Sequence, residues 1–173
     1  MRIETKRLII RNFELSDKDD LREYMIQRVN AKFEAYPDFT VEKAEEEIRY
    51  RAKSEEFFAI ELKNSSKVIG NIYLGKREFN SRELGYVLNE KYQNKGYVTE
   101  ASKAIVNYFF SKGVHRIYAE CSPENIPSWK VMNNIGMERE AHLRKNVSFH
   151  NDEKGNPIYW DTYVYAVLNP NEI

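Results

Sequence analysis

Apolar residues change their spacing between residues 81 and 113, which makes this stretch the most informative part of the chain. Residues 81–89 predict a strand, and residues 93–98, Gln-Asn-Lys-Gly-Tyr-Val, predict a tight turn. We expect a helix to begin at Thr99 and to end at Gly113, because glycine readily takes the positive φ found after a helix C-terminus. One face of that helix repeats at i, i+3, i+4, i+7 and i+8 and comprises Ala101, Ala104, Ile105, Tyr108 and Phe109.

The remaining apolar segments predict six more strands and three more helices. The strands are expected at residues 7–13, 56–62, 68–75, 116–122, 137–149 and 158–168, and the helices begin at Ser16, Thr40 and Pro127. Strands 81–89 and 116–122 flank one helix, so a right-handed crossover can make them parallel neighbours, whereas hairpins join most of the others. Residues 1–173 are therefore expected to form one domain, a mixed α/β sheet covered by helices.

The charge balance and the cysteine content exclude several classes of protein. Lys+Arg and Asp+Glu both number 27, so the formal net charge is zero and broad binding to nucleic acid is not expected. Cys121 is the one cysteine, which rules out an internal disulfide and fits a reducing compartment. The charged N-terminus is unlike a signal peptide and no apolar run is long enough for a membrane span, so we expect a cytoplasmic protein without membrane contact. The histidines lack metal-ligand spacing, and we expect no metal site.

The turn at residues 93–98 is predicted to bind an anion. A turn that leads into a helix leaves backbone N–H groups unpaired, and the aligned peptide dipoles add partial positive charge, so phosphate is the usual occupant. The turn is neither a P-loop nor a Gly-x-Gly-x-x-Gly dinucleotide motif. Asn125 and Ser128 stand three residues apart at the next helix start, and both helix starts follow strands that end at one edge of the sheet, where open α/β sheets bind ligands.

Several motifs occur in the order typical of a known family. Gln93-x-x-Gly96-x-Val98 resembles the acetyl-CoA motif of the GNAT acetyltransferases. Residues 96–101, Gly-Tyr-Val-Thr-Glu-Ala, are similar to the Gly-Tyr-Ala-Thr-Glu-Ala of the RimJ/RimL-type branch, which acetylates the N-terminal amines of proteins such as ribosomal proteins. The second motif of the branch is matched by Asn125, Ser128, Met132, Gly136 and Met137. Residues 3–11 resemble the first strand of the branch, and its last strand is matched by Trp160, Asp161, Tyr165 and Ala166.

The resemblance covers essentially the whole chain and implies both a fold and an activity. The implied fold is a single GNAT domain with a mostly antiparallel sheet of six to seven strands, a splayed parallel pair at residues 81–89 and 116–122, and about four flanking helices. The implied activity is an acetyl-CoA-dependent N-acetyltransferase that transfers acetyl directly to a primary amine. The branch also suggests a protein N-terminal α-amine as the acceptor and a homodimer paired through the long final strands.

The resemblance also implies roles for individual residues. Backbone groups of Tyr86, Val87 and Leu88 would pair with the pantetheine arm of acetyl-CoA, and Asn125 would hydrogen-bond it. Ser128 would supply the leaving thiolate with a proton or a hydrogen bond. The pyrophosphate would lie against the backbone of Gln93, Asn94, Lys95, Gly96, Tyr97, Val98 and Thr99. Val98 departs from the Gly or Ala that is usual there, and its bulk and β-branching are expected to weaken binding without abolishing it.

Two glutamates are candidates for the base that deprotonates the amine. An α-amine has a pKa of about 7.7–8.0, so one mild base suffices. Glu83 ranks first because it matches the acidic position before Gly-Tyr in the branch, and Glu120 ranks second; Tyr118 and His142 rank lower. A backbone N–H near Val87 or Leu88 would stabilise the oxyanion. The strand parity of Cys121 places it with apolar residues, so we expect a buried thiol and not an acyl carrier.

Three functions remain open from the sequence. The first is an acetyltransferase whose acceptor is a protein N-terminus or a small amine such as a polyamine, an aminosugar or an amino acid. The second is an acyl-CoA sensor without catalysis, and the third is a nucleotide-binding protein of another class that uses the same helix start. The presence of both Asn125 and Ser128 favours the enzyme. The acceptor is expected to enter opposite CoA, between residues 30–39 and the turn at 150–157.

Overall fold

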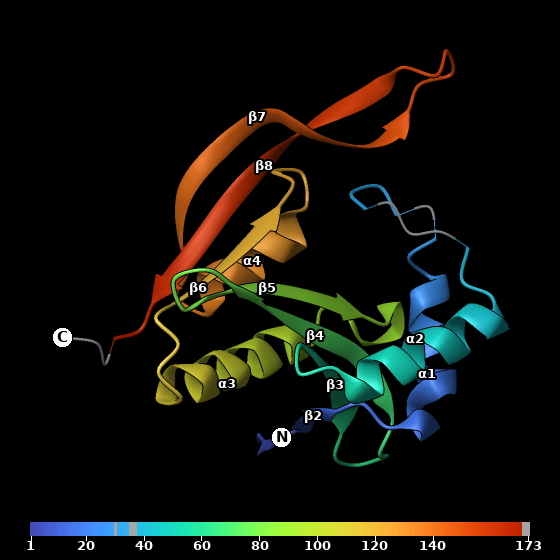
Figure 1. Cartoon of the computed structure of the whole chain (residues 1–173), viewed down its shortest axis with the longest axis vertical. Coiled ribbons are helices and arrows are strands. Elements are labelled where there is room, and N and C mark those ends of the chain that lie inside the picture. Colours follow the sequence, from blue (N-terminus) through green and yellow to red (C-terminus); the bar gives the residue numbers. More distant parts are fainter. Residues whose placement is uncertain (30, 35–37, 171–173) are drawn as a thin grey trace.

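An eight-stranded sheet forms the body of the protein in a computed structural model that describes residues 1–29, 31–34 and 38–170 (Figure 1). The strand order is β1-β2-β3-β4-β5-β6-β8-β7, and neighbours are antiparallel except for β5 and β6, which run parallel. The strands are β1 (Arg2–Glu4), β2 (Leu8–Asn12), β3 (Phe57–Leu62), β4 (Val68–Arg77), β5 (Ser81–Leu88), β6 (Arg116–Cys121), β7 (Glu138–Asn151) and β8 (Pro157–Leu168).

Four α-helices among the described residues cover the two faces of the sheet. They are α1 (Lys18–Ile26), α2 (Val41–Lys53), α3 (Tyr97–Ser111) and α4 (Ile126–Asn134), with short 3-10 turns η1 (Leu15–Asp17) and η2 (Glu90–Tyr92). Helices α1 and α2 pack on the face that carries Ala59 and Val87. Helices α3 and α4 pack on the opposite face, which carries Ile60 and Leu84. The central strands are therefore buried on both sides.

The predicted sheet is confirmed in its main features, a mostly antiparallel sheet with one parallel pair. It has one strand more than the six to seven expected, because the segment Arg2–Glu4 pairs with β2. This segment is short, and its alternation is hard to recognise among charged residues. The long β7–β8 hairpin was predicted, and it extends away from the helices at one end of the sheet (Figure 1).

Two helix starts differ from those expected. Helix α1 follows the turn η1, and Asp17, not Ser16, organises this start by accepting the backbone N–H of Glu14 at 2.8 Å. Helix α3 begins at Tyr97 and not at Thr99, because Gly96 adopts a φ of +75° and completes the turn two residues earlier. The predicted end of this helix at Gly113 is confirmed by a φ of +83°.

The parallel pair opens after three residue pairs. Ser81, Arg82 and Glu83 lie opposite residues 116–118, and within the described part of the chain the two strands do not pair beyond this point. Strand β5 continues to Leu88 against β4, and β6 continues to Cys121 against β8. The two strand ends therefore diverge and leave one edge of β5 without a strand partner.

Candidate active site

The loop between β5 and α3 turns sharply and leads into the N-terminus of the helix. Asn94 and Gly96 adopt φ values of +59° and +75°, which turn the chain sharply into the helix. Glu100 is the first residue whose backbone N–H donates within α3, to the carbonyl of Gly96 at 3.0 Å, so the three helical residues before it keep their N–H groups for other partners. Val98 is buried as the second residue of α3 and is not required to take a positive φ.

Arg7, immediately before β2, ties this loop to the sheet. Its Nε and its backbone N–H donate to the carboxylate of Glu100 at 2.6 Å and 2.9 Å, and its Nη1 donates to the carbonyl of Lys95 at 2.9 Å. The guanidinium also lies over the ring of Tyr97, 4.4 Å from the ring centre. Thr5 adds a hydrogen bond of 2.6 Å to Glu100. Sequence reasoning identified neither Arg7 nor Glu100 as a site residue.

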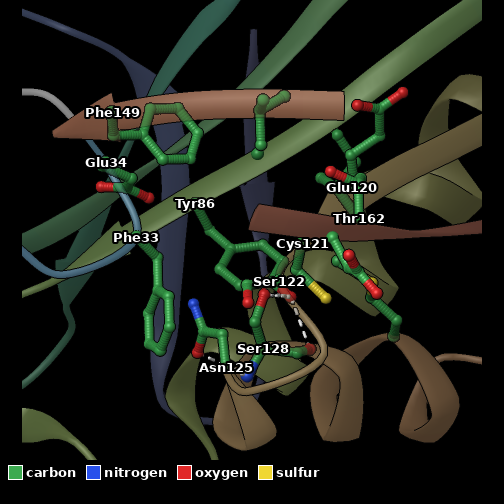
Figure 2. A pocket seen from close by; sticks show the side chains of 15 residues that line it. Phe33, Glu34, Tyr86, Glu120, Cys121, Ser122, Asn125, Ser128, Phe149 and Thr162 are labelled. Atoms are coloured by element: carbon green, nitrogen blue, oxygen red, sulfur yellow. Dashed lines mark hydrogen bonds between the residues drawn. The ribbon is translucent and has the colours of Figure 1, made fainter. Parts of the chain in front are cut away.

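A cavity of about 200 Å³ lies where β5 and β6 diverge. Its walls come from β5, β6, α4, β7, β8 and the segment 31–34. Figure 2 shows Phe33, Glu34 and Phe149 on one side of the cavity and Glu120 and Thr162 on the other. Of the segments expected to line the acceptor entrance, Phe33 and Glu34 line the cavity, and Phe149 lines it just before the turn at 150–157. Residues 30 and 35–37 lie outside the described residues.

Two hydroxyl groups meet on the floor of the cavity (Figure 2). The hydroxyl of Tyr86 donates to the backbone carbonyl of Ser128 at 2.8 Å and lies 3.0 Å from Ser128 Oγ. Asn125 caps α4, and its side-chain oxygen accepts the backbone N–H of Ser128 at 3.4 Å. Burial raises the pKa of Tyr86 well above its usual value, so this phenol stays protonated at neutral pH. The sequence predicted that Asn125 and Ser128 lie in the same site, but for Tyr86 it predicted a role of the backbone only.

The two candidate glutamates occupy different environments. Glu83 forms an ion pair with Arg77, whose guanidinium also donates to the hydroxyl of Tyr73 at 3.3 Å, and Glu83 does not line the cavity. Glu120 lines the cavity while part of its side chain stays exposed, and partial burial raises its pKa, with repulsion from Glu83 as the second cause. Both causes disfavour its charged form, which makes Glu120 a stronger base than an ordinary glutamate.

The other candidates are placed less favourably for catalysis. Cys121 is half-buried at the cavity wall, not fully buried as expected, and burial raises its pKa to about 11, so the thiol stays protonated at neutral pH and is a poor nucleophile. His142 lies on the exposed surface of β7, with Nε2 2.6 Å from a carboxylate oxygen of Asp161. Tyr118 lies opposite Glu83 in the paired part of β5 and β6, and burial raises its pKa.

An unpaired strand edge can bind an extended thioester arm, and a helix start beside it can bind phosphates. Together with a small cavity beside that edge, these features suit an acyltransferase that uses acyl-CoA. The chain belongs to the GNAT acetyltransferases, since residues 7–138 match the family model described as an acetyltransferase (GNAT) domain.

Relatives and solved structures agree with this assignment. The chain is 40% identical to an N-acetyltransferase of Bacillus subtilis (strain 168), YnaD, described as uncharacterized, over 97% of each chain. It is similar to the structure of a GNAT-family acetyltransferase from Bacillus anthracis, with 36% identity, a TM-score of 0.87, and coverage of 98% and 99% of the two chains. The ribosomal-protein-S5-alanine acetyltransferase from Vibrio fischeri shares the fold, with a TM-score of 0.82 at 22% identity and coverage of 99% and 98%.

The predicted family and enzyme class are thereby confirmed. The protein is an N-acetyltransferase that uses acetyl-CoA, and this is the first of the three functions that the sequence left open. Within the part of the chain that the structure describes, no helix is long and apolar enough to cross a membrane.

Proposed function

We propose that the enzyme transfers acetyl from acetyl-CoA directly to a primary amine held in the cavity between β5 and β6, and that the acceptor is the N-terminal α-amine of a peptide. The observation that carries this proposal is the cavity itself. It lies at the end of the unpaired edge of β5, and it brings Tyr86, Glu120 and Ser128 around one small space (Figure 2).

Acetyl-CoA fits the open edge of β5. The backbone N–H of Asn89 donates to Ile69 on the β4 side at 2.8 Å, and since backbone groups alternate along a strand, Val87 also faces β4. Tyr86 and Leu88 consequently face the opening, so these two residues, and not Val87, would pair with the pantetheine arm. The pyrophosphate would bind N–H groups of residues 94–99, since the N–H of Gln93 already donates to the carbonyl of Glu90 at 3.2 Å, and Asn125 would lie beside the arm.

Acetyl transfer needs a base, an oxyanion donor and a partner for the leaving sulfur. Glu120 would take a proton from the amine, directly or through one water, while the nitrogen attacks the thioester carbonyl carbon. The N–H of Leu88 would stabilise the oxyanion. Ser128 would donate a hydrogen bond to the sulfur as the C–S bond breaks, and the proton lost by the amine would reach the thiolate through solvent. Glu83 ranks below Glu120 because Arg77 already binds its carboxylate.

The size and the lining of the cavity favour a linear acceptor. About 200 Å³ is less than the roughly 300–1,000 Å³ of most small-molecule sites, so with the thioester in place only the amine and a short substituent can enter. Carboxylates of Glu34, Glu120 and Asp161 line the cavity and would attract a protonated amine. The rest of the acceptor would leave between Phe33 and Phe149. A peptide N-terminus meets these conditions, and the enzyme from Vibrio fischeri is named for a ribosomal-protein alanine.

An acceptor screen read by mass spectrometry tests the proposal. The enzyme and acetyl-CoA are incubated with peptides that have a small N-terminal residue, with the same peptides blocked at the N-terminus but carrying an internal lysine, and with polyamines, aminosugars and free amino acids. We expect one acetyl group on the free N-terminal amine and none on the blocked peptides. Acetylation of small amines with the peptides left unmodified would replace the proposed acceptor, and acetylation of no acceptor would refute the transfer itself.

The choice of base has its own test. Glu120→Gln should lower kcat by about 100-fold or more, the usual contribution of a positioned base, with little change in the KM for acetyl-CoA. The matched control is Glu83→Gln, which removes the same charge one strand away and should retain most of the activity. A larger loss in Glu83→Gln than in Glu120→Gln would reverse the assignment.

We also propose that the protein forms a homodimer through β7. This strand is one of the two edges of the sheet, it is 14 residues long, and most of its side chains are exposed. Size-exclusion chromatography with light scattering should give twice the chain mass of 20.6 kDa. A monomer at all micromolar concentrations would contradict this part of the proposal.

A further inference from the structure

The contact between Tyr86 and Ser128 joins two residues 42 positions apart, one on β5 and the other in the first turn of α4. From this contact we infer that Tyr86 is a positioning residue, which holds the hydroxyl of Ser128 where the sulfur of CoA departs. The inference rests on the role proposed for Ser128. Helix α4 itself carries Trp129 and no tyrosine, so the phenol beside Ser128 comes from the sheet.

The hydrogen-bond chemistry defines how this pair works. A carbonyl oxygen only accepts, so the Tyr86 proton is directed to the Ser128 carbonyl at 2.8 Å. The lone pairs of the phenol oxygen are then free to accept the proton of Ser128 Oγ, 3.0 Å away. The Cys121 thiol is a second side chain within hydrogen-bond reach of Ser128, and the contact with Tyr86 favours the orientation in which the serine proton points to the phenol oxygen.

The pair can respond when the C–S bond breaks without any net proton loss from tyrosine. As negative charge develops on sulfur, the Ser128 proton turns toward it, and the Tyr86 proton turns from the carbonyl to Ser128 Oγ. Each hydroxyl keeps its own proton, and Ser128 becomes a better donor because its oxygen now accepts a hydrogen bond. Tyr86 is unsuited to act as the acid itself, because its buried phenolate would be poorly solvated.

Burial of the tyrosine ring supports a fixed position. The ring packs against the core cluster that contains Leu84 and Met132, and Met132 is 1% exposed on α4. The ring is held by this packing independently of its hydroxyl. Tyr86→Phe should therefore keep the ring and the cavity wall in place while it removes only the hydroxyl.

A double-mutant cycle with Tyr86→Phe, Ser128→Ala and the combined variant tests the inference. The loss of one neutral hydrogen bond predicts a fall in kcat of about 3- to 10-fold for Tyr86→Phe, with an unchanged KM for acetyl-CoA. In the Ser128→Ala background the same change should have no further effect, because the hydroxyl it positions is absent. The control is Tyr24→Phe, which removes the hydroxyl of a fully buried tyrosine outside the cavity and should leave kcat unchanged.

The outcomes separate this inference from the proposed function. If Tyr86→Phe lowers kcat by the same factor with and without Ser128, the two hydroxyls act independently and the inference is wrong. If Tyr86→Phe raises only the KM for acetyl-CoA, the phenol serves cofactor binding and the inference is again wrong. If Ser128→Ala has full activity, the role proposed for Ser128 fails and the inference fails with it, although acetyl transfer itself still stands.

Discussion

Replacing Arg7 with alanine should weaken acetyl-CoA binding although Arg7 does not line the cavity. The side chain connects the start of β2 to the carboxylate of Glu100, to the carbonyl of Lys95 and to the ring of Tyr97. All three partners belong to the loop and helix start that we propose as the pyrophosphate site. Without Arg7 the loop would sample conformations that do not bind phosphate, and binding would have to restore its order.

The expected size of the effect follows from these contacts. The ion pair with Glu100 is 40% exposed on the Arg7 side, so solvent screening limits its contribution to about 0.5 kcal/mol. The hydrogen bond to the Lys95 carbonyl contributes about 1 kcal/mol and the stacking on Tyr97 about 0.5 kcal/mol. Because Thr5 and the backbone N–H of residue 7 keep their bonds to Glu100, we expect a net loss near 1.4 kcal/mol, which is a tenfold higher Kd for acetyl-CoA.

Calorimetric titration with CoA and steady-state kinetics measure this effect. Arg7→Ala should raise the Kd for CoA and the KM for acetyl-CoA about tenfold and change kcat less than twofold, and Arg7→Lys should fall between, because an ammonium cannot form the same fork. Arg2→Ala is the matched control, since it removes an arginine from an exposed ion pair with Glu4, and both of these residues are on β1, the strand next to β2. A Kd for Arg7→Ala within twofold of wild type would refute the reasoning.

Two further predictions concern stability. A side chain at Gly70 would clash with the backbone carbonyl of Val87, so Gly70→Ala should lower Tm by about 4–8 °C. The control is Gly85→Ala, whose new Cβ would lie 3.6 Å from its nearest neighbour and which should shift Tm by less than about 2 °C. Equal shifts of the two variants in thermal denaturation would contradict this reasoning. Hydrogen bonds led by Lys67 lower the pKa of Glu23 from 4.5 to about 2, so its contribution is present above pH 4.5 and is lost as the pH falls toward 2. Glu23→Gln should therefore cost about 1 kcal/mol in urea melts at pH 7, after allowance for solvent screening, and progressively less below pH 4.5; a constant cost would exclude this explanation.

The parts of the site that the sequence predicted are those built from near neighbours. The turn at residues 93–98 and the cap of α4 each lie within a few residues, so turn chemistry and capping preferences are sufficient to indicate them. Asn125 and Ser128 are three residues apart, and the backbone N–H of Ser128 donates to both the side-chain oxygen and the backbone carbonyl of Asn125. The two-residue error at the start of α3 arose because Thr99 is a good capping residue, although the positive φ of Gly96 ends the turn first.

The parts that the sequence missed depend on distant contacts. Arg7 and Glu100 are 93 residues apart, and nothing in the local pattern of either residue indicates the other. The sequence offered no sign that Arg77 forms an ion pair with Glu83 across the β4–β5 hairpin, and this pair is the reason why we now propose Glu120 before Glu83. Single-sequence reasoning identifies ionisable residues, but their usefulness in catalysis depends on which charges the tertiary fold places beside them.

The opening between β5 and β6 also explains how acetyl-CoA and the acceptor amine could enter the site from different faces of the sheet. Alternate side chains of a strand point to opposite faces, so Tyr86 and Cys121 lie on the face of α3 and α4, whereas Gly85 and Glu120 lie on the face of α1 and α2. In a continuous sheet a small cavity could contact residues of only one face, yet all four of these residues line the cavity between β5 and β6.

The cavity therefore passes through the sheet where the two strands separate. Acetyl-CoA would reach it from the side of the α3 helix start, and the amine would reach it from the side of Phe33 and Phe149. On this arrangement the candidate base Glu120 and the candidate sulfur partner Ser128 would act on the tetrahedral intermediate from different faces of the sheet. Direct transfer in a ternary complex then needs no acyl-enzyme intermediate, which agrees with the raised pKa of Cys121.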